Sequence, residues 1–181
     1  MHVVHHGAHH GVTGSCHQLM IDESRSLLID CGYFQGSEAK GRDQEQIDFP
    51  VDGISGLIVT HVHLDHVGRI PYLIAAGFKG PIYCSPPSAK LLPLMLEDAM
   101  RVGVTRNKRL IERFLGDLRK HIRPLAYAKW HKIDGGIQLR LMPAGHILGS
   151  AVVEVEHDGE RFVFSGDLGS RPQPLLKDPQ S

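Results

Sequence analysis

Three histidines and an aspartate lie close together in the segment His61-Val62-His63-Leu64-Asp65-His66. The segment follows the apolar run 57–60, so a strand that ends at Thr60 would leave these side chains in a tight loop. His61 and His63 would then point the same way, while Asp65 and His66 turn toward a second position. Imidazoles and carboxylates together suit zinc best, with iron or manganese as alternatives. The spacing therefore predicts a metal site for two ions. The alternative is chance clustering of surface histidines in a chain that has 13 of them.

Two further candidate ligands each follow an apolar stretch that alternates with polar residues. His146 comes after the stretch 137–142, and Asp167 comes after the stretch 161–165. Each would sit at the carboxyl end of a strand, where loops gather chemistry on a rigid scaffold. Either residue alone is more typical of a turn, but with the first cluster they complete a plausible ligand set.

The elements that must position these residues follow from apolar patterning. Strands are expected at 19–21, 27–30, 57–60, 81–84, 137–142, 152–156 and 161–165. Asp158-Gly159 between the last two predicts a hairpin turn. Helices are expected at 66–76, 88–101 and 105–120, the second capped by Ser88. The third would bury one apolar face, made of Leu110, Ile111, Phe114, Leu115 and Leu118.

Composition is consistent with one soluble domain. The chain has 181 residues, of which 41% are hydrophobic and 22% charged, enough to bury a sizeable core. No apolar run reaches the length of about 18 residues that a membrane span needs, and the N-terminus lacks the basic-then-apolar order of a signal peptide, so a cytoplasmic location is expected. Cys16, Cys31 and Cys84 are too few and too irregularly spaced for a disulfide framework, which favours free, buried thiols.

Two charged or titratable regions remain open to interpretation. Basic and acidic residues balance at 20 each, yet the segment 101–123 has eight basic residues against Glu112 and Asp117. This basic face could guide a phosphate backbone toward the metals, or it could be a solvated helix surface. The amino-terminal histidines, among them His9 and His10, are interpreted as ordinary loop residues, with a place at the mouth of the site as the alternative.

The sequence resembles the metallo-β-lactamase superfamily, whose pattern is His-x-His-x-Asp-His, then one His, then one Asp, each after a strand. Its motifs are similar to those of the RNA-processing β-CASP nuclease branch. The segments that carry this likeness are 11–15, 28–36, 66–71, 144–146 and 165–169. The resemblance implies an α/β fold, the αβ/βα sandwich of that superfamily, over residues 1–170. Residues 171–181 are proline-rich and are expected to form a tail or linker.

The resemblance also implies roles for individual residues. His61, His63 and His146 would hold one metal ion, Asp65 and His66 would hold the other, and Asp167 would bridge both. Asp30 would orient the ligand loop by hydrogen bonds. Asp30, Asp65 and Asp167 are thus the candidate catalytic carboxylates. The implied cofactors are two divalent metal ions, with Zn²⁺ the best fit and Mn²⁺ or Fe as alternatives.

The function implied by the resemblance is hydrolysis of single-stranded RNA by a hydroxide shared between two metals. Members of the branch continue with an inserted domain and further histidines, so the second sheet is expected to be incomplete here. Weak second-site metal binding, little turnover and dimerisation through exposed apolar surface are the corresponding expectations. An esterase or lactonase on the same scaffold is the alternative within enzymes. A noncatalytic module that binds metal or RNA is the alternative outside them.

Overall fold

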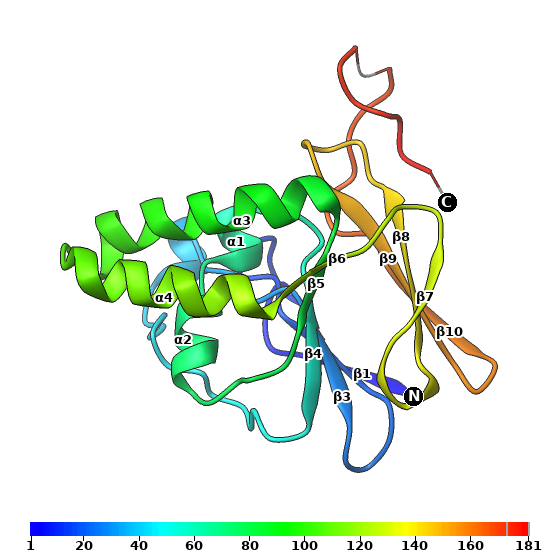
Figure 1. The fold of residues 1–181 in the computed structure, drawn as a ribbon, viewed down its shortest axis with the longest axis horizontal. Helices are drawn as coiled ribbons and strands as arrows, with labels where there is room; N and C mark the ends of the chain where they lie inside the picture. Colours follow the sequence, from blue (N-terminus) through cyan, green and yellow to red (C-terminus); the bar gives the residue numbers. More distant parts are fainter. Residues whose placement is uncertain (173, 181) are drawn as a thin grey trace.

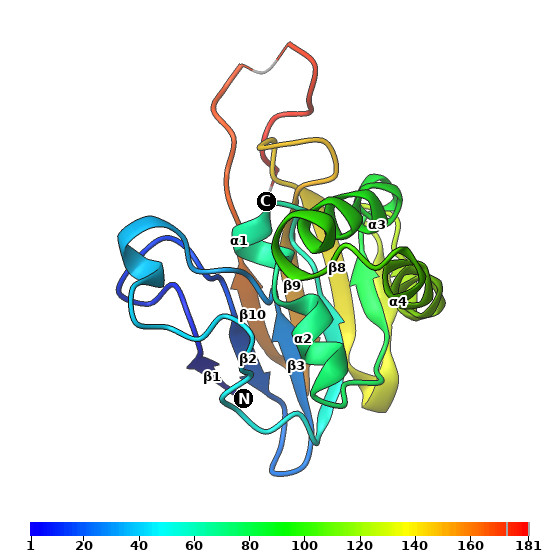
Figure 2. The ribbon, with the colours of Figure 1, turned by 90° about the vertical axis from the view of Figure 1, so that its left-hand side faces the viewer.

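Two β-sheets pack against each other, and helices cover the outer face of the first sheet (Figures 1 and 2). The computed structural model describes residues 1–172 and 174–180. Gln173 and Ser181, which belong to the tail predicted from the sequence, lie outside the described residues. The order of layers is therefore helices, first sheet, second sheet.

The first sheet is mixed and has its strands in sequence order. The six strands are β1 (His2–His5), β2 (His17–Met20), β3 (Ser26–Ile29), β4 (Ile54–Ile58), β5 (Ile82–Cys84) and β6 (Ile122–Pro124). β1 pairs with β2 and β2 with β3 in antiparallel fashion, whereas the pairs β3–β4, β4–β5 and β5–β6 are parallel. All four residues of β3 are buried, as expected for a strand that is covered on both faces.

The second sheet is an antiparallel sheet of four strands in the order β10-β9-β8-β7. Its strands are β7 (Trp130–Lys132), β8 (Gln138–Pro143), β9 (Ala151–His157) and β10 (Glu160–Phe164). Asp158 and Gly159 join β9 to β10 with φ values of 50° and 80°, the left-handed pair that a tight two-residue turn needs. The hairpin predicted from Asp158-Gly159 is confirmed.

Four α-helices lie on the first sheet. They are α1 (Leu64–Val67), α2 (Ile70–Ala75), α3 (Pro86–Ala99) and α4 (Lys108–His121). Short 3-10 turns lie at Gly36–Ala39 and Asp134–Gly136, and a π-turn at Met100–Val104 follows α3. Asn107 caps α4 by accepting hydrogen bonds from the backbone N–H groups of Arg109 and Leu110.

Two apolar cores hold the layers together. Between the helices and the first sheet lie side chains such as Leu57, Leu73 and Leu96. Between the two sheets, Ile29 and Ile58 of the first sheet meet residues such as Val153 of the second. Cys16, Cys31 and Cys84 are buried free thiols, as predicted. Because the two cores pack against the two faces of the first sheet, the carboxyl ends of β3 and β4 are held in place, and the loops that follow them start from a rigid base.

Several sequence expectations were wrong in detail. The expected helix 66–76 is two short helices, α1 and α2, separated at Gly68 and Arg69. Ser85, not Ser88, caps α3, because prolines occupy the first turn and the Ser85 side chain accepts from the backbone N–H of Ser88. Leu110 is 52% exposed, since it precedes buried Ile111 by one residue and is rotated about 100° from it around the helix.

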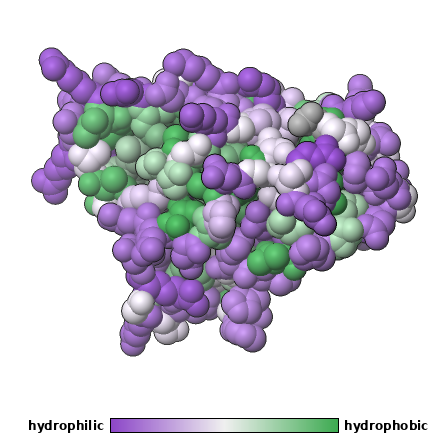
Figure 3. Space-filling model, turned by 90° about the horizontal axis from the view of Figure 1, so that it is seen from below, coloured by the Kyte–Doolittle hydropathy of each residue, from purple (hydrophilic) through white to green (hydrophobic). Residues whose placement is uncertain are grey.

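In the part of the chain that the structure describes, helices cover only one of the two sheets. No described helix lies on the outer face of the second sheet, and Val163 there is 59% exposed. None of the described helices has the length and apolar character that a membrane crossing requires. Seen from below, apolar areas are separated by hydrophilic surface (Figure 3). Dimerisation through apolar surface stays a prediction.

Candidate metal centre

The cluster 61–66 lies where β4 ends and α1 begins. The extended chain continues past Ile58, as shown by the hydrogen bond from the Val59 N–H to the Tyr83 carbonyl. His61 is completely buried, and His63 is the N-cap residue of α1. Asp65 and His66 lie in α1 itself. A turn from strand to helix therefore divides the cluster, with His61 and His63 before α1 and Asp65 and His66 within it.

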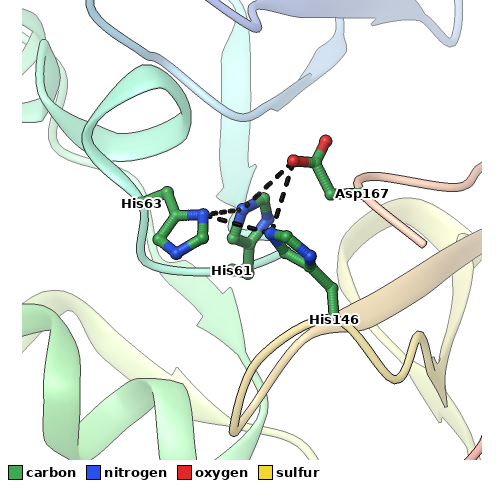
Figure 4. A group of neighbouring side chains, drawn as sticks. All are labelled: His61, His63, His146 and Asp167. Carbon is green, nitrogen blue, oxygen red and sulfur yellow. Dashed lines mark hydrogen bonds and ion pairs between the residues drawn. The ribbon is translucent and has the colours of Figure 1, made fainter. Parts of the chain in front are cut away.

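Four side chains from three separate segments converge at this point (Figure 4). They are His61, His63, His146 and Asp167, and their ligand atoms all lie within 4.8 Å of one another. Nδ1 of His63 lies 3.1 Å from Nε2 of His61 and 3.2 Å from Nε2 of His146. Oδ2 of Asp167 lies 3.9 Å from Nε2 of His61 and 3.5 Å from Nε2 of His146.

These separations match the coordination shell of a small metal ion. A tetrahedron of ligands at about 2.0 to 2.1 Å from zinc has edges of about 3.3 to 3.4 Å. The measured distances of 3.1 to 3.9 Å bracket that value. The three imidazole rings also meet edge to face, with ring centres 4.7 to 5.0 Å apart, which brings their nitrogen atoms to a common point. The donor set therefore fits a divalent metal.

A second group of donors lies beside the first. Nε2 of His66 is buried and has no hydrogen-bond partner among the described residues. It lies 3.4 Å from Oδ1 of Asp167 and 3.9 Å from Oδ2 of Asp65. The two carboxylate oxygens of Asp167 thus face different groups, one toward His61 and His146, the other toward His66. This geometry suits a carboxylate shared between two positions.

Asp30 lies beneath this second group, directly after β3. Its backbone has a φ of 59°, an uncommon conformation outside glycine that aspartate tolerates better than most residues. Oδ2 accepts hydrogen bonds from Nδ1 of His66 at 2.7 Å, from the Thr60 hydroxyl at 2.8 Å and from the Ser15 hydroxyl at 3.2 Å. Oδ1 accepts from the Thr60 N–H at 2.8 Å. Because Nδ1 of His66 donates to Asp30, its Nε2 is left with a free lone pair that points at the site.

Burial and charge set the protonation of these groups. Burial lowers the pKa of His61 to about 3. Burial and the neighbouring His146 likewise lower the pKa of His63. At His66 burial acts in the same direction, but the hydrogen bond and charge of Asp30 outweigh it and raise the pKa. Burial would raise the pKa of Asp30, yet the His66 and Thr60 hydrogen bonds lower it. His61 and His63 are therefore neutral near pH 7, the form that binds metal.

Sequence reasoning missed several residues that position the centre. The Ser150 hydroxyl accepts hydrogen bonds from the N–H groups of His146 and Ile147, and so shapes the loop that carries His146. Ser15 and Thr60 hold Asp30. A single hydroxyl residue has no distinctive spacing, so the sequence offers no signal for these roles.

The amino-terminal histidines divide into two groups. His5 and His17 line a cavity of about 310 Å³ together with Asp30, His66 and Asp167, and their Nδ1 atoms lie 2.8 Å apart. They sit opposite each other on the paired strands β1 and β2. His9 and His10 lie at a different hollow, lined also by Phe34 and Glu38.

Comparison with known proteins gives a consistent assignment. The sequence model of the metallo-beta-lactamase superfamily matches residues 11–180. Ribonuclease TTHA0252 of Thermus thermophilus is 39% identical over 99% of this chain, which covers 40% of that protein. Transcription termination factor FttA of Methanosarcina mazei is 38% identical over 84% of the chain and 25% of the factor. Integrator complex subunit 11 of Danio rerio is 28% identical over 94% of the chain and 30% of the subunit.

The chain thus spans a quarter to two fifths of the length of these relatives. The fold agrees with a solved structure, the Zn²⁺-bound PqqB of Methylobacterium extorquens. It superposes with a TM-score of 0.54 over 83% of this chain and 52% of PqqB, at 13% identity. The resemblance drawn from the His-x-His-x-Asp-His pattern is confirmed: this chain belongs to the metallo-beta-lactamase superfamily, and its similar proteins include a ribonuclease and RNA-processing factors.

Proposed function

We propose that this chain carries the active site of a metal-dependent hydrolase that cleaves phosphodiester bonds of single-stranded RNA. The observation that carries the proposal is the position of Asp167, whose two oxygens face two separate sets of imidazole nitrogens. A site built this way suits a pair of ions better than a single one.

We assign the residues as follows. His61, His63 and His146 hold one ion, Asp65 and His66 hold the second, and Asp167 contacts both. Zinc fits the imidazole-rich first position best, with manganese or iron as alternatives. Asp30 is a positioning residue, because it reaches the site only through His66 and Thr60.

When bound, two such ions supply a water of lowered pKa and neutralise charge on a phosphate oxygen. The chain's own contribution is placement. Buried His61 stays unprotonated well below neutral pH, and Asp30 fixes the ring of His66 so that Nε2 faces Asp65 and Asp167. Because α1 begins at Leu64, His63 and His66 are held at the two ends of one helical turn.

RNA is the preferred substrate class because of the relatives. Proteins 39% and 28% identical to this chain are named a ribonuclease and an Integrator subunit. The chain covers less than half of either, so activity of these residues on RNA is our proposal. The alternative substrate is a carboxylic ester or a lactone, because the same fold with different side chains around the metal centre can serve another hydrolysis.

The test is a cleavage assay on end-labelled single-stranded RNA, with and without a chelator. His63→Ala should abolish cleavage and lower the metal content measured by elemental analysis. His2→Ala is the matched control, because His2 is exposed on the edge strand β1. Circular dichroism of both variants reports whether the fold is retained.

Three results would be informative. RNA cleavage that chelator and His63→Ala both abolish supports the proposal. Retention of RNA without cleavage at any metal concentration would overturn it in favour of a binding module. Hydrolysis of an aryl ester or a lactone, with intact RNA in the same tube, would place the activity in the other substrate class.

A further inference from the structure

A second, larger cavity lies away from the metal centre. Its volume is about 820 Å³, against about 310 Å³ for the cavity at Asp167 and His66, and the two share no lining residue. Its walls come from β6, the edge strand of the first sheet, and β7, the edge strand of the second. The cavity is therefore a feature of the open side of the sandwich.

The lining of this cavity is strongly basic. Lys79, Lys120, Arg123 and Lys132 contribute four positive charges, and no aspartate or glutamate belongs to the lining among the described residues. Lys79, Arg123 and Lys132 are exposed. Lys120 is paired with Asp117 at 2.8 Å, so three of the four charges dominate the local field. Such a concentration of positive charge attracts phosphates.

Aromatic surface lies next to these charges. Trp130 and Tyr83 line the same cavity. The guanidinium groups of Arg140 and Arg161 lie 4.7 and 5.2 Å from the centre of the Trp130 ring, and each arginine is paired with a glutamate. The ring is thus held in place from the second sheet and stays half-buried at the cavity wall.

The geometry points to a binding site for single-stranded RNA in this cavity, separate from the metal centre. Lys79, Arg123 and Lys132 contact the phosphates, and a base packs against Trp130. Sites for single strands generally combine a basic groove with aromatic side chains on which bases rest. This inference rests on the proposed function for its choice of RNA. It adds a second contact, outside the site of cleavage, that holds the substrate.

Trp130 makes the inference directly measurable. It is the only tryptophan of the chain, so its fluorescence reports on this cavity alone. We would titrate the full chain with a 12-nucleotide oligouridine in the presence of chelator, which prevents cleavage. Saturable quenching of the Trp130 emission is the expected result. The same titration with uridine monophosphate tests whether a chain of phosphates is needed.

Two double variants test the charges. Lys79→Glu/Lys132→Glu reverses two charges of the lining and should weaken oligouridine binding about tenfold or more. The slope of the logarithm of the binding constant against the logarithm of the salt concentration should become smaller by about 0.7 for each lost phosphate contact. Lys40→Glu/Lys90→Glu makes the same change in net charge at two exposed positions that lie outside both the cavity lining and the basic segment 101–123. It should leave the affinity within about twofold. Unchanged circular dichroism shows that each variant is folded.

The outcomes separate this inference from the proposed function. If the lining variant weakens the quenching and the control variant does not, the cavity is supported as an RNA site even when no cleavage is found. RNA cleavage with no change of Trp130 emission would overturn the cavity and leave the proposed function standing. Equal effects of both double variants, or binding of uridine monophosphate as tight as that of the oligonucleotide, would also overturn it.

Discussion

Oδ2 of Asp30 lies 2.7 Å from Nδ1 of His66, and this contact joins the end of β3 to α1. Both side chains are buried, at 1% and 3% exposure. The same oxygen also accepts the Thr60 hydroxyl, which lies one residue before His61. The Asp30 carboxylate therefore connects β3, the loop that carries His61, and the helix α1 that carries His66.

Asp30→Asn is expected to damage both stability and metal binding. Asparagine keeps one accepting oxygen where Asp30 uses two, so either His66 or the Thr60 N–H faces an amide NH2 group. The buried carboxylate partner of His66 is also lost, which costs about 3 kcal/mol or more. The ring of His66 is then free to turn, and metal affinity should fall about 10-fold to 100-fold. Urea unfolding of the metal-free protein and a metal titration of the folded protein measure the two effects separately.

Asp22→Asn is the matched control for that variant. Asp22 accepts hydrogen bonds from Ser24 and Arg25 in an exposed turn, so it also has several partners, but it lies far from the ligands in the fold. It should leave metal affinity unchanged. If Asp30→Asn unfolds and binds metal like this control, the positioning role of Asp30 is wrong.

Gly32→Ala is expected to disturb the centre without removing any ligand. A Cβ atom at Gly32 would lie 1.7 Å from the backbone oxygen of Asp65, so the start of α1 must move. Asp65 and His66 would move with it, and metal content should fall. Elemental analysis of the purified variant measures this. Gly116→Ala is the control, because a Cβ there meets nothing within 4 Å and α4 should gain about 0.8 to 1 kcal/mol. Full metal content in Gly32→Ala would count against this close approach.

The candidate metal-binding cluster was the easiest part of the molecule to predict from sequence. His61, His63, Asp65 and His66 lie within six residues, and the alternation before His146 and Asp167 marked two more strand ends. Asp158-Gly159 fixed the last hairpin because few turns accept two left-handed residues in sequence. In each case the chemistry of a few neighbouring residues decides the local structure.

The parts that the sequence did not reveal depend on distant partners. β1, β6 and β7 are only three or four residues long and show no clear alternation, so pairing across the sheet defines them. The contact between His17 and His5, whose Nδ1 atoms lie 2.8 Å apart, depends on the pairing of β2 with β1. The basic cavity joins Lys79, Lys120 and Lys132, which lie on three different elements or loops.

Metal titration is expected to show two unequal steps. The first group offers four ligand atoms, from His61, His63, His146 and Asp167, within 4.8 Å. The second offers Nε2 of His66 and oxygens of Asp65 and Asp167 at 3.4 to 3.9 Å, so it has fewer donors in looser geometry. Isothermal titration calorimetry of zinc-free protein should therefore give one tight and one weak site.

Two variants assign the steps. Asp65→Asn should weaken only the second step, whereas His146→Gln should weaken the first by removing one of its three imidazoles. Two equal steps in the unmodified chain, or loss of the same step in both variants, would contradict the assignment of ligands to two positions.

Acid should destabilise the metal-free protein well before the carboxylates titrate. His61 has its pKa lowered to about 3, and the pKa values of His63 and His17 are also lowered, with burial as the main cause in each case. As the pH falls below 6.5, these histidines take up protons more readily in the unfolded chain than in the folded one. The free energy of unfolding should fall by up to about 1.4 kcal/mol per pH unit for each such group.

His66 acts with the opposite sign, because Asp30 raises its pKa above that of the unfolded chain. Its stabilising contribution is fully present below pH 6.5 and is lost as the pH rises through the folded pKa. Because the His66 contribution is constant below pH 6.5, the lowered pKa values of His61, His63 and His17 determine the change there, and the stability falls between pH 6.5 and 4. Urea unfolding in chelator at several pH values measures the slope, and His61→Gln should flatten it because glutamine does not titrate. A metal-free chain whose stability is constant or rises as the pH falls through this range would show that these imidazoles are not buried in their neutral form.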